Sequence, residues 1–304
     1  MTTPAAGTAA SPLLRSGFEY RRIDVEGIMI NCAIGGSGPP LLMLHGYPEN
    51  HLMWRHVAPG LARDHTVVLA DLRGYGDSGK PATDAGGNVY SKRLMARDQV
   101  GLMRHFGFGR FQLVGHDRGA RVAHRLALDH PGAVTKLAVL DIVPTRHVFG
   151  NVTRSMATGY YHWFFLPVGN GLPEHLIGAD PAYWMRSLIG PLLGEGASID
   201  PAVMDDYIRC FSDPRAIAGS CADYRSAASI DLVHDDETFS AGQQVGCPVL
   251  VLWGAQGFVG REYSPLSVWR EYATDVRGEA LPTGHFLPEE APEETSAALA
   301  DFLD

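Results

Sequence analysis

One short stretch of the chain combines a carboxylate with the glycine spacing of a nucleophile turn. Asp117 stands in Gly115-His116-Asp117-Arg118-Gly119, between an apolar run (residues 111–114) and an amphipathic run (residues 120–130). A sharp strand-to-helix turn forces the residue at its tip into unusual backbone geometry, and flanking glycines let neighbouring backbone pass close by. The pattern predicts an elbow that exposes the Asp117 side chain above a sheet edge. The alternative is an ordinary βα loop in which Asp117 caps the helix.

Aspartate at the tip narrows the chemistry that this turn could perform. A carboxylate is ionised at neutral pH, with a reference pKa of ~3.9, so no base has to remove a proton before it attacks carbon. Attack on saturated carbon gives an alkyl ester of the enzyme, which water can open at the carbonyl group, whereas serine would give a stable ether. Asp117 therefore favours substrates with a leaving group on sp3 carbon, such as alkyl halides or epoxides, over esters and amides.

Hydrolysis of such an ester needs a base and an acid that orients the base. His285 comes just after the last predicted strand (residues 276–281), which is where the base is expected. The acid usually follows either the strand after the elbow or the penultimate strand. The loop after the penultimate strand (residues 254–258) holds no carboxylate, so the candidate is Asp141, at the end of residues 136–142. The alternative is that Asp141 merely caps the following turn.

Backbone and side-chain groups next to the elbow could bind oxygen atoms. The backbone N–H groups of Tyr47 and Arg118 would form an oxyanion hole for ester hydrolysis. Arg118 and Arg121 are three residues apart at the start of a helix, so their side chains can face the same side. Guanidinium groups bind carboxylates in a planar, bidentate way, which favours an anionic substrate. The alternative is pairing with neighbouring acids on a solvated face, which we prefer for Arg125.

The elements that must position these residues alternate between strands and helices. Residues 18–25 and 28–34 form a predicted strand pair. Further strands are predicted at residues 41–44, 65–72, 111–114, 136–142, 248–253 and 276–281, and helices at residues 91–106, 120–130, 264–272 and 292–303. This alternation is typical of an α/β protein with a mostly parallel sheet covered by helices.

The alternation stops for about a hundred residues after Pro144. This segment is rich in aromatic residues and prolines and has mostly helical patches. We therefore predict a tail (residues 1–16), a core domain (residues 17–144 and 246–304) and an inserted helical cap (residues 145–245).

Composition and charge exclude several classes of protein. The 304 residues are 45% hydrophobic, enough for a large core, and the net charge of −9 argues against a nucleic-acid or membrane-surface partner. No apolar run approaches the ~18 residues of a membrane span.

The four cysteines are scattered, so we expect reduced thiols and no metal site. The N-terminus lacks the pattern of a secretory signal, which favours a cytoplasmic location. Gly74, Gly76 and Gly79 have dinucleotide-binding spacing, but a loop follows where a helix is needed.

Taken together, these features resemble the α/β-hydrolase fold and, within it, the fluoroacetate or haloacetate dehalogenases. The resemblance to the fold covers nearly the whole chain after residue 16 and rests on His45-Gly46-Tyr47-Pro48, residues 73–78, the elbow and His285. The features specific to the dehalogenases are residues 116–121 and, in the cap, Tyr161-His162-Trp163 and Asp223-Tyr224-Arg225. Arg118 is the most informative of these, because haloalkane dehalogenases and many epoxide hydrolases have tryptophan directly after the nucleophile.

The resemblance implies a function and further site residues. In the family, a cap histidine, the tryptophan after it and a tyrosine hold the departing halide, which gives those roles to His162, Trp163 and Tyr224. It implies a cofactor-free hydrolase that converts a short 2-haloacid, such as haloacetate including fluoroacetate, to glycolate and halide. Relatives are often homodimers. They also tend to carry another tryptophan near the middle of the cap, whereas residues 188–192 have none and Trp184 is only nearby.

Two other functions fit parts of the sequence. An epoxide hydrolase would need cap tyrosines that donate to the epoxide oxygen, and the candidates are Tyr160, Tyr161, Tyr183 and Tyr224. A protein of this fold could instead bind a small acid without catalysis. The complete set of nucleophile, base and acid argues against a binding protein.

Overall fold

The computed structural model describes residue 13, residues 16–84 and residues 87–304 of the chain. Most of the predicted tail therefore lies outside the described residues. The described residues form an eight-stranded sheet with the strand order β1-β2-β4-β3-β5-β6-β7-β8. The strands are β1 Glu19–Val25, β2 Ile28–Gly36, β3 Pro40–Leu44, β4 Thr66–Ala70, β5 Phe111–His116, β6 Val134–Leu140, β7 Val249–Gly254 and β8 Val276–Leu281.

The sheet is mostly parallel, as the sequence predicts. β1 and β2 form the predicted antiparallel pair, β2 is also antiparallel to β4, and every pairing from β4 to β8 is parallel. All six residues of β5 are buried, as expected of a strand in the middle of a parallel sheet, which is covered on both faces. The α/β fold class is confirmed.

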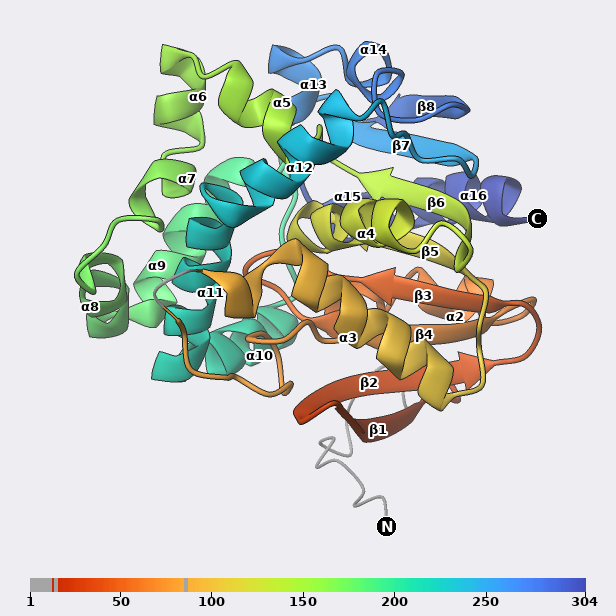
Figure 1. Ribbon diagram of the computed structural model, residues 1–304. Helices are drawn as coiled ribbons and strands as arrows, with labels where there is room; N and C mark the ends of the chain where they lie inside the picture. Colours follow the sequence, from red (N-terminus) through yellow and green to blue (C-terminus); the bar gives the residue numbers. More distant parts are fainter. Residues whose placement is uncertain (1–12, 14–15, 85–86) are drawn as a thin grey trace.

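Helices cover both faces of the sheet (Figure 1): α3 and α4 lie against one face, and α2 and α16 against the other. The helices of the core are α2 Ala58–Leu61, α3 Lys92–His105, α4 Asp117–Asp129, α13 Phe258–Glu262, α14 Pro265–Trp269, α15 Leu287–Glu290 and α16 Pro292–Leu303, with 3₁₀ turns at His51–Trp54 and Asn88–Tyr90. The predicted bounds of α16 are confirmed, whereas α14 ends three residues before the predicted Tyr272. No helix begins at Gly79, in agreement with the argument against a dinucleotide site.

All elements between β6 and β7 are helical, and we call residues 145–240 the cap segment. It lies beyond the carboxyl ends of the parallel strands (Figure 1). Its helices are α5 Thr145–Gly150, α6 Arg154–Gly159, α7 His162–Phe165, α8 Leu172–Ala179, α9 Pro181–Ile189, α10 Pro201–Phe211, α11 Pro214–Ala227 and α12 Ile230–Ser240, with a 3₁₀ turn at Gly190–Leu192. The exact division into core and cap domains stays a prediction.

Aspartate–proline pairs start three helices of the cap segment. Asp180, Asp200 and Asp213 each accept a hydrogen bond from a backbone N–H of the first turn, and proline occupies the first helical position after each. Aspartate satisfies an otherwise free donor and proline lacks the donor altogether, so the pair fixes where each helix begins.

Three other expectations can be compared with the described residues. None of their helices is long and apolar enough to cross a membrane. They contain no group of histidine, cysteine and acidic side chains arranged to hold a metal ion. Cys32, Cys210 and Cys221 are buried free thiols, whereas Cys247 is half-buried.

Candidate active site

Asp117 is at the tip of a sharp turn between β5 and α4. Its φ of +43° lies in the left-handed region, which aspartate rarely adopts. The flanking glycines are needed for close packing: a Cβ at Gly119 would lie 2.3 Å from the carbonyl oxygen of His45, and one at Gly115 would lie 2.6 Å from Ala120 Cα. The helix takes His116 as its N-cap, without a side-chain cap. The predicted elbow is present, and the alternative in which Asp117 caps the helix is wrong.

His285 and Asp141 meet Asp117 at the carboxyl ends of the strands. Nδ1 of His285 is 2.6 Å from Asp141 Oδ2, and because a carboxylate only accepts, Nδ1–H is the donor. The backbone N–H of Gly254 donates to Asp141 Oδ1 at 3.0 Å. Nε2 of His285 lies 4.0 Å from Asp117 Oδ2. The structure therefore brings the three predicted residues together, in the order acid, base, nucleophile.

Positive charges around the elbow keep Asp117 ionised. Burial alone would raise the pKa of its carboxyl group, but His285, Arg121, His116 and Arg118 outweigh burial and lower the pKa to about 2. A carboxylate with this pKa is an anion throughout the neutral range and can attack carbon without a base.

The loop that carries Tyr47 is fixed over the elbow. The backbone N–H of Tyr47 donates to Asp117 Oδ1 at 3.0 Å, as expected of one of the two oxyanion-hole groups. His45 locks the loop, because its Nδ1 is 2.8 Å from the Gly46 carbonyl oxygen and its Nε2 accepts from the backbone N–H of Leu72 at 3.0 Å. Gly46 has no room for a side chain, since a Cβ there would lie 2.7 Å from Asp117 Cβ.

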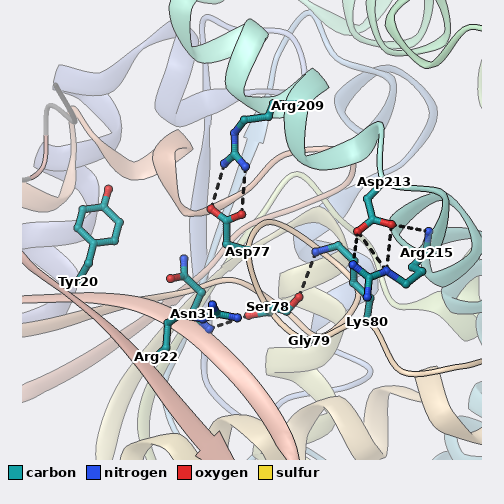
Figure 2. A pocket seen from close by; sticks show the side chains of 10 residues that line it. All are labelled: Tyr20, Arg22, Asn31, Asp77, Ser78, Gly79, Lys80, Arg209, Asp213 and Arg215. Carbon is teal, nitrogen blue, oxygen red and sulfur yellow. Dashed lines mark hydrogen bonds and ion pairs between the residues drawn. The ribbon is translucent and has the colours of Figure 1, made fainter. Parts of the chain in front are cut away.

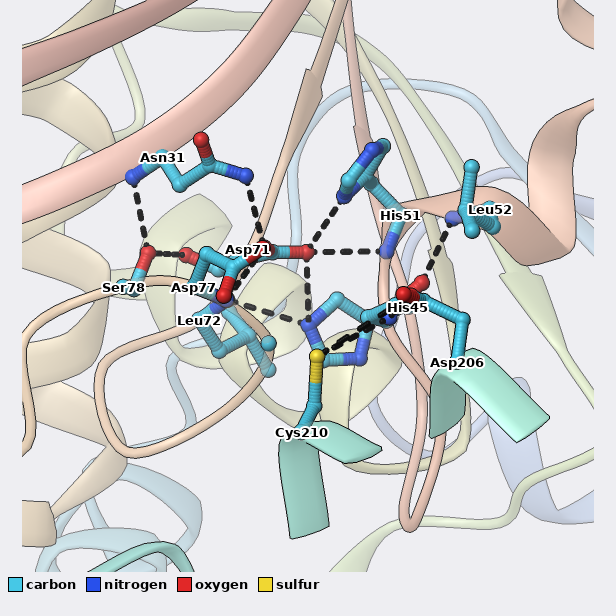
Figure 3. A network of polar contacts seen from close by, with 12 residues as sticks. Asn31, His45, His51, Leu52, Asp71, Leu72, Asp77, Ser78, Asp206 and Cys210 are labelled. Atoms are coloured by element: carbon cyan, nitrogen blue, oxygen red, sulfur yellow. Dashed lines mark hydrogen bonds and ion pairs between the residues drawn. The ribbon is translucent and has the colours of Figure 1, made fainter. Parts of the chain in front are cut away.

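A buried network centred on Asp71 lies next to this loop (Figure 3). The Asp71 carboxylate accepts from Asn31 Nδ2, from the backbone N–H of Asp77 and from both Nδ1 and the backbone N–H of His51, at 2.8–2.9 Å. Burial would raise the pKa of Asp71, but His51 outweighs burial and lowers it. The network ties the loop after β3 to the loop after β4 and so stabilises the Tyr47 position.

Arg118 is buried and points one edge of its guanidinium group at an acid of the cap segment. Its Nε and Nη2 donate to the two carboxylate oxygens of Asp223 at 3.0 and 2.8 Å, and Nη2 also donates to the Asp223 carbonyl oxygen at 3.0 Å. Its Nη1 is buried and has no partner among the described residues. The pairing with an acid, one of the two alternatives for Arg118, is thus present, but without a solvated face, and it leaves one N–H edge free.

Arg121 also has a free N–H group. Its Nη1 donates to the Val143 carbonyl oxygen and to Thr145 Oγ1, both at 3.0 Å, and its buried Nε has no partner in the described ranges. Burial lowers the pKa of Arg121 to about 10, so the group is a cation at neutral pH. For Arg125, the expected pairing with an acid is present, because its Nε lies 3.7 Å from Asp129 Oδ1, but the expected solvated face is wrong. Arg125 is 2% exposed, because α12 covers it, and it donates to Thr238 Oγ1 at 3.0 and 3.1 Å.

The three predicted halide-binding side chains gather beside the arginines. The ring centroid of Tyr224 is 5.7 Å from that of His162 and 5.9 Å from that of Trp163, edge-to-face in both cases. The Arg118 guanidinium carbon lies 4.1 Å from the Tyr224 ring centroid. His162 Nδ1 is buried and unpartnered within the described residues, and burial lowers the pKa of His162 to about 3. A neutral imidazole and two aromatic side chains are thus available as hydrogen-bond donors.

A family model described as alpha/beta hydrolase fold matches residues 39–292. The chain belongs to the α/β-hydrolase fold family. It is 48% identical over 293 residues to the fluoroacetate dehalogenase of Burkholderia sp, covering 94% of each chain. It is 33% identical over 282 residues to the soluble epoxide hydrolase of Corynebacterium sp. strain C12, covering 90% of this chain and 93% of that one. A solved structure from Nostoc sp PCC 7120, described as an alpha/beta hydrolase, has a TM-score of 0.92 and 53% identity and covers 94% of this chain and 98% of that one.

These comparisons confirm the resemblance to haloacetate dehalogenases and the prediction of a hydrolase. The fluoroacetate dehalogenase is considerably more similar than the epoxide hydrolase, at 48% against 33% identity. The roles of individual residues are not decided by identity and stay predictions.

The cap departs from the expected pattern near its middle, and another residue reaches the site there. Residues 188–192 have no tryptophan, but Trp184 Nε1 donates to the Tyr47 hydroxyl at 2.7 Å, so the cap contacts Tyr47 through Trp184. The backbone N–H of His285 donates to the Leu192 carbonyl oxygen at 2.8 Å. The chain at Leu192 therefore lies against His285, the predicted base.

The sequence reasoning missed a buried ion pair under the elbow of this α/β-hydrolase. Glu49 Oε2 lies 3.2 Å from His116 Nδ1, and both side chains are completely buried. His116 Nε2 donates to the His285 carbonyl oxygen at 2.8 Å. Burial lowers the pKa of His116, but Glu49 outweighs burial and raises it to about 9. The position of Glu49 directly after the His45–Pro48 motif was the only signal in the sequence.

A polar cavity of about 420 Å³ lies between β1, β2, the loop after β4 and helices α10 and α11, and its lining shares Asn31 and Asp77 with the Asp71 network (Figure 2). It contains the ion pairs Asp77–Arg209 and Asp213–Arg215, whose charges satisfy one another. None of the predicted site residues lines it. It is therefore not the candidate active site.

Proposed function

We propose that this α/β-hydrolase cleaves the carbon–halogen bond of short 2-haloacids, haloacetates including fluoroacetate, and gives glycolate and halide. The observation that carries the proposal is the pairing of an ionised nucleophile, Asp117, with two buried guanidinium groups that each keep an N–H without a partner among the described residues. Buried donors without partners are costly, so such groups indicate a ligand that satisfies them. A carboxylate next to a reactive carbon is the ligand that both arginines fit.

In the first step, a carboxylate oxygen of Asp117 attacks the α-carbon opposite the halogen. Arg118 Nη1 and Arg121 Nε donate to the substrate carboxylate and hold the carbon in line with the nucleophile. The new carbon–oxygen bond forms as the carbon–halogen bond breaks with its electron pair. The products of this step are an ester on Asp117 and a halide ion.

Three donors stabilise the charge that develops on the leaving halide. The neutral His162 ring can donate through an N–H, Trp163 through its indole N–H and Tyr224 through its hydroxyl group. Donors that meet charge present only in the transition state raise the rate rather than the affinity for the substrate.

In the second step, water opens the ester at its carbonyl carbon. Nε2 of His285 takes a proton from this water, and Asp141 stabilises the resulting imidazolium through the 2.6 Å hydrogen bond to Nδ1. The backbone N–H groups of Tyr47 and Arg118 hold the oxyanion. Collapse of the tetrahedral intermediate transfers the His285 proton to the leaving glycolate alkoxide and leaves Asp117 as a carboxylic acid. This acid loses the second proton of the water to solvent, which regenerates the Asp117 carboxylate.

An epoxide hydrolase is the second candidate, and one observation favours it. Tyr160 is buried and its hydroxyl has no partner in the described part of the chain, so it could donate to an epoxide oxygen, together with the buried Tyr224. Tyr161 and Tyr183 are 40% and 72% exposed and are poorly placed for this role. The two buried arginines favour the haloacid.

The deciding experiment measures products from the purified protein. Fluoroacetate, chloroacetate and a neutral epoxide are each supplied in large excess, and halide, glycolate and diol are quantified over time. We expect many equivalents of halide and of glycolate in equal amounts. Diol from the epoxide without halide from either acid would favour the second candidate, and no turnover of any of the three would favour a binding protein.

Three finer expectations belong to the same proposal. We place the cap at residues 145–245, in agreement with the helices found there, and the protein in the cytoplasm. We also expect a homodimer. Six of the eight large apolar side chains that are exposed in the described residues lie in a short part of the cap segment: Tyr161, Phe164, Val168, Leu172, Leu176 and Tyr183. Such a concentration of apolar side chains is typical of an interaction surface.

A further inference from the structure

Asp223, a completely buried acid of α11, accepts hydrogen bonds from three residues of the core. Its Oδ1 accepts from Lys92 Nζ and from Arg118 Nη2, the latter at 2.8 Å. Its Oδ2 accepts from the Tyr75 hydroxyl at 2.7 Å and from Arg118 Nε at 3.0 Å. Two cations and one neutral hydroxyl thus share a single carboxylate. The relative exposure of Asp223 and Arg118 side chains is 0%, and that of Lys92 is 4%.

This sharing has a consequence for the charge of Arg118. A carboxylate paired with one guanidinium group alone would neutralise it, and a neutralised group attracts a second carboxylate weakly. Lys92 Nζ donates to the same Asp223 oxygen as Arg118 Nη2. It also lies 4.0 Å from a second buried acid, Asp231 of α12. Because water is excluded here, these charges are screened less than they would be at the surface. Because Lys92 is within hydrogen-bond distance of Asp223 but 4.0 Å from Asp231, whose pKa is raised by burial, it mainly offsets Asp223 and leaves Arg118 with a positive charge for another anion.

The geometry of Arg118 agrees with this. The Nε and Nη2 edge that faces α11 is occupied, whereas Nη1 is buried and unpartnered within the described residues. The Tyr224 ring covers one face of the guanidinium group, 4.1 Å away, and limits its rotation. Asp223 and Tyr224 are neighbours on the same helix, so the cap segment both orients Arg118 and supplies a predicted halide donor.

We propose that Lys92 and Asp223 are positioning residues that set the affinity of Arg118 for the carboxylate of the substrate. Asp223 fixes the orientation of the guanidinium group, and Lys92 keeps that group from being neutralised by Asp223. The inference rests on the proposed function, because it needs Arg118 to bind the haloacid.

The test is Lys92→Met, which removes the charge and keeps an unbranched side chain next to Met95, whose Sδ is 3.7 Å from Lys92 Nζ. KM for chloroacetate should rise about 5- to 30-fold, a range set by removal of one charge in a weakly screened site. kcat should change less than about threefold, because the reacting atoms stay in place. kcat/KM for the neutral chloroacetamide, measured at high enzyme concentration, should stay within about threefold of the parent.

Two further variants separate charge from structure. Tyr75→Phe removes a neutral donor from the same Asp223 carboxylate, so it tests hydrogen bonding at this site without a change of charge. We expect a smaller rise in KM than in Lys92→Met. Arg93→Met removes a cation from the next position of α3, where Arg93 pairs with Asp129 at 2.9 Å on a partly exposed face, and should leave both substrates unaffected.

A KM for chloroacetate in Lys92→Met equal to that of the parent would overturn the proposal. An equal loss of kcat/KM for chloroacetate and chloroacetamide would also overturn it, because such a loss indicates a structural role. If Lys92→Met does not fold, as judged by circular dichroism, Lys92→Gln is measured in its place under the same criteria. Failure of the proposed function would look different, because the parent itself would then release no halide.

Discussion

Removal of the Tyr224 hydroxyl group should slow the release of fluoride more than the release of chloride. In Tyr224→Phe the ring stays between His162 and Trp163, with centroids 5.7 and 5.9 Å away. The Arg118 guanidinium group, 4.1 Å from the ring centroid, can still lie on a phenylalanine, because the interaction needs only the aromatic face. The variant therefore removes one hydrogen-bond donor and little else.

The size of the effect follows from the charge that the donor meets. Fluoride is the smallest and most charge-dense halide, and its bond to carbon is the strongest, so its departure depends most on donors that meet the developing charge. Loss of one such hydrogen bond costs about 1–3 kcal/mol. This corresponds to about 5- to 150-fold in rate, at ~1.4 kcal/mol per tenfold. Chloride spreads its charge over a larger volume, and we expect a loss near the lower end of that range.

The assay compares two ratios. Single-turnover halide release is measured with excess enzyme for fluoroacetate and chloroacetate, in the parent and in Tyr224→Phe, so that the chemical step is observed directly. The ratio of the fluoroacetate rate to the chloroacetate rate should fall in the variant, by about 30-fold if the fluoride loss is about 150-fold and the chloride loss about fivefold. If the ratio stays the same and both rates are near those of the parent, Tyr224 is only packing in the cap and the halide binds elsewhere.

Three other perturbations test separate parts of the site. Arg118→Lys should lower kcat/KM for chloroacetate about tenfold or more, because an ammonium group cannot donate to the cap and to the substrate in one plane; steady-state kinetics showing a loss below about threefold would contradict this. Gly46→Ala places a Cβ 2.7 Å from Asp117 Cβ, so the nucleophile must shift, and kcat should fall about 100-fold while the circular dichroism spectrum stays native; an active variant would show that the loop yields instead. Burial lowers the pKa of His51, but Asp71 outweighs burial and raises this pKa above 6.5. The stabilisation from the His51–Asp71 pair is therefore complete below pH 6.5 and is lost as the pH rises through the raised pKa. The difference in unfolding free energy between the parent and His51→Gln should therefore be smaller at pH 9 than at pH 6. A difference that does not depend on pH would refute the charged pair.

The positions of Asp117, Asp141 and His285 could be predicted from the sequence because their signals are local. Glycines two residues before and after Asp117 mark the elbow, and both glycines prove to be in contact with backbone. Parallel strands end at the same edge of a sheet, so residues that follow different strands, such as Asp141 and His285, were expected to meet there. The predicted strand that leads to Asp141 was shifted, because the φ of +50° at Asp141 ends the extended conformation at Leu140.

The contacts of Arg118 and Arg125 with the cap could not be predicted, because they depend on how the cap packs on the core. Asp223 is 105 positions away from Arg118 in sequence, and no local pattern reports that the two side chains pair. The same packing explains the error at Arg125. Its position on an amphipathic helix predicted a solvated face, but α12 covers that face and buries the charge. Hydrophobic periodicity in the sequence identifies the polar side of a helix, but it does not show which element packs against that side.

The covalent intermediate is the central claim, and the most direct test is a variant that should accumulate it. In His285→Asn the base is lost while the nucleophile, the arginines and the halide donors remain. With chloroacetate the variant should release about one halide per active site and then stop. Mass spectrometry of the digested protein should find a carboxymethyl ester on the peptide that contains Asp117. Steady halide release, or a burst without an adduct on Asp117, would contradict the mechanism.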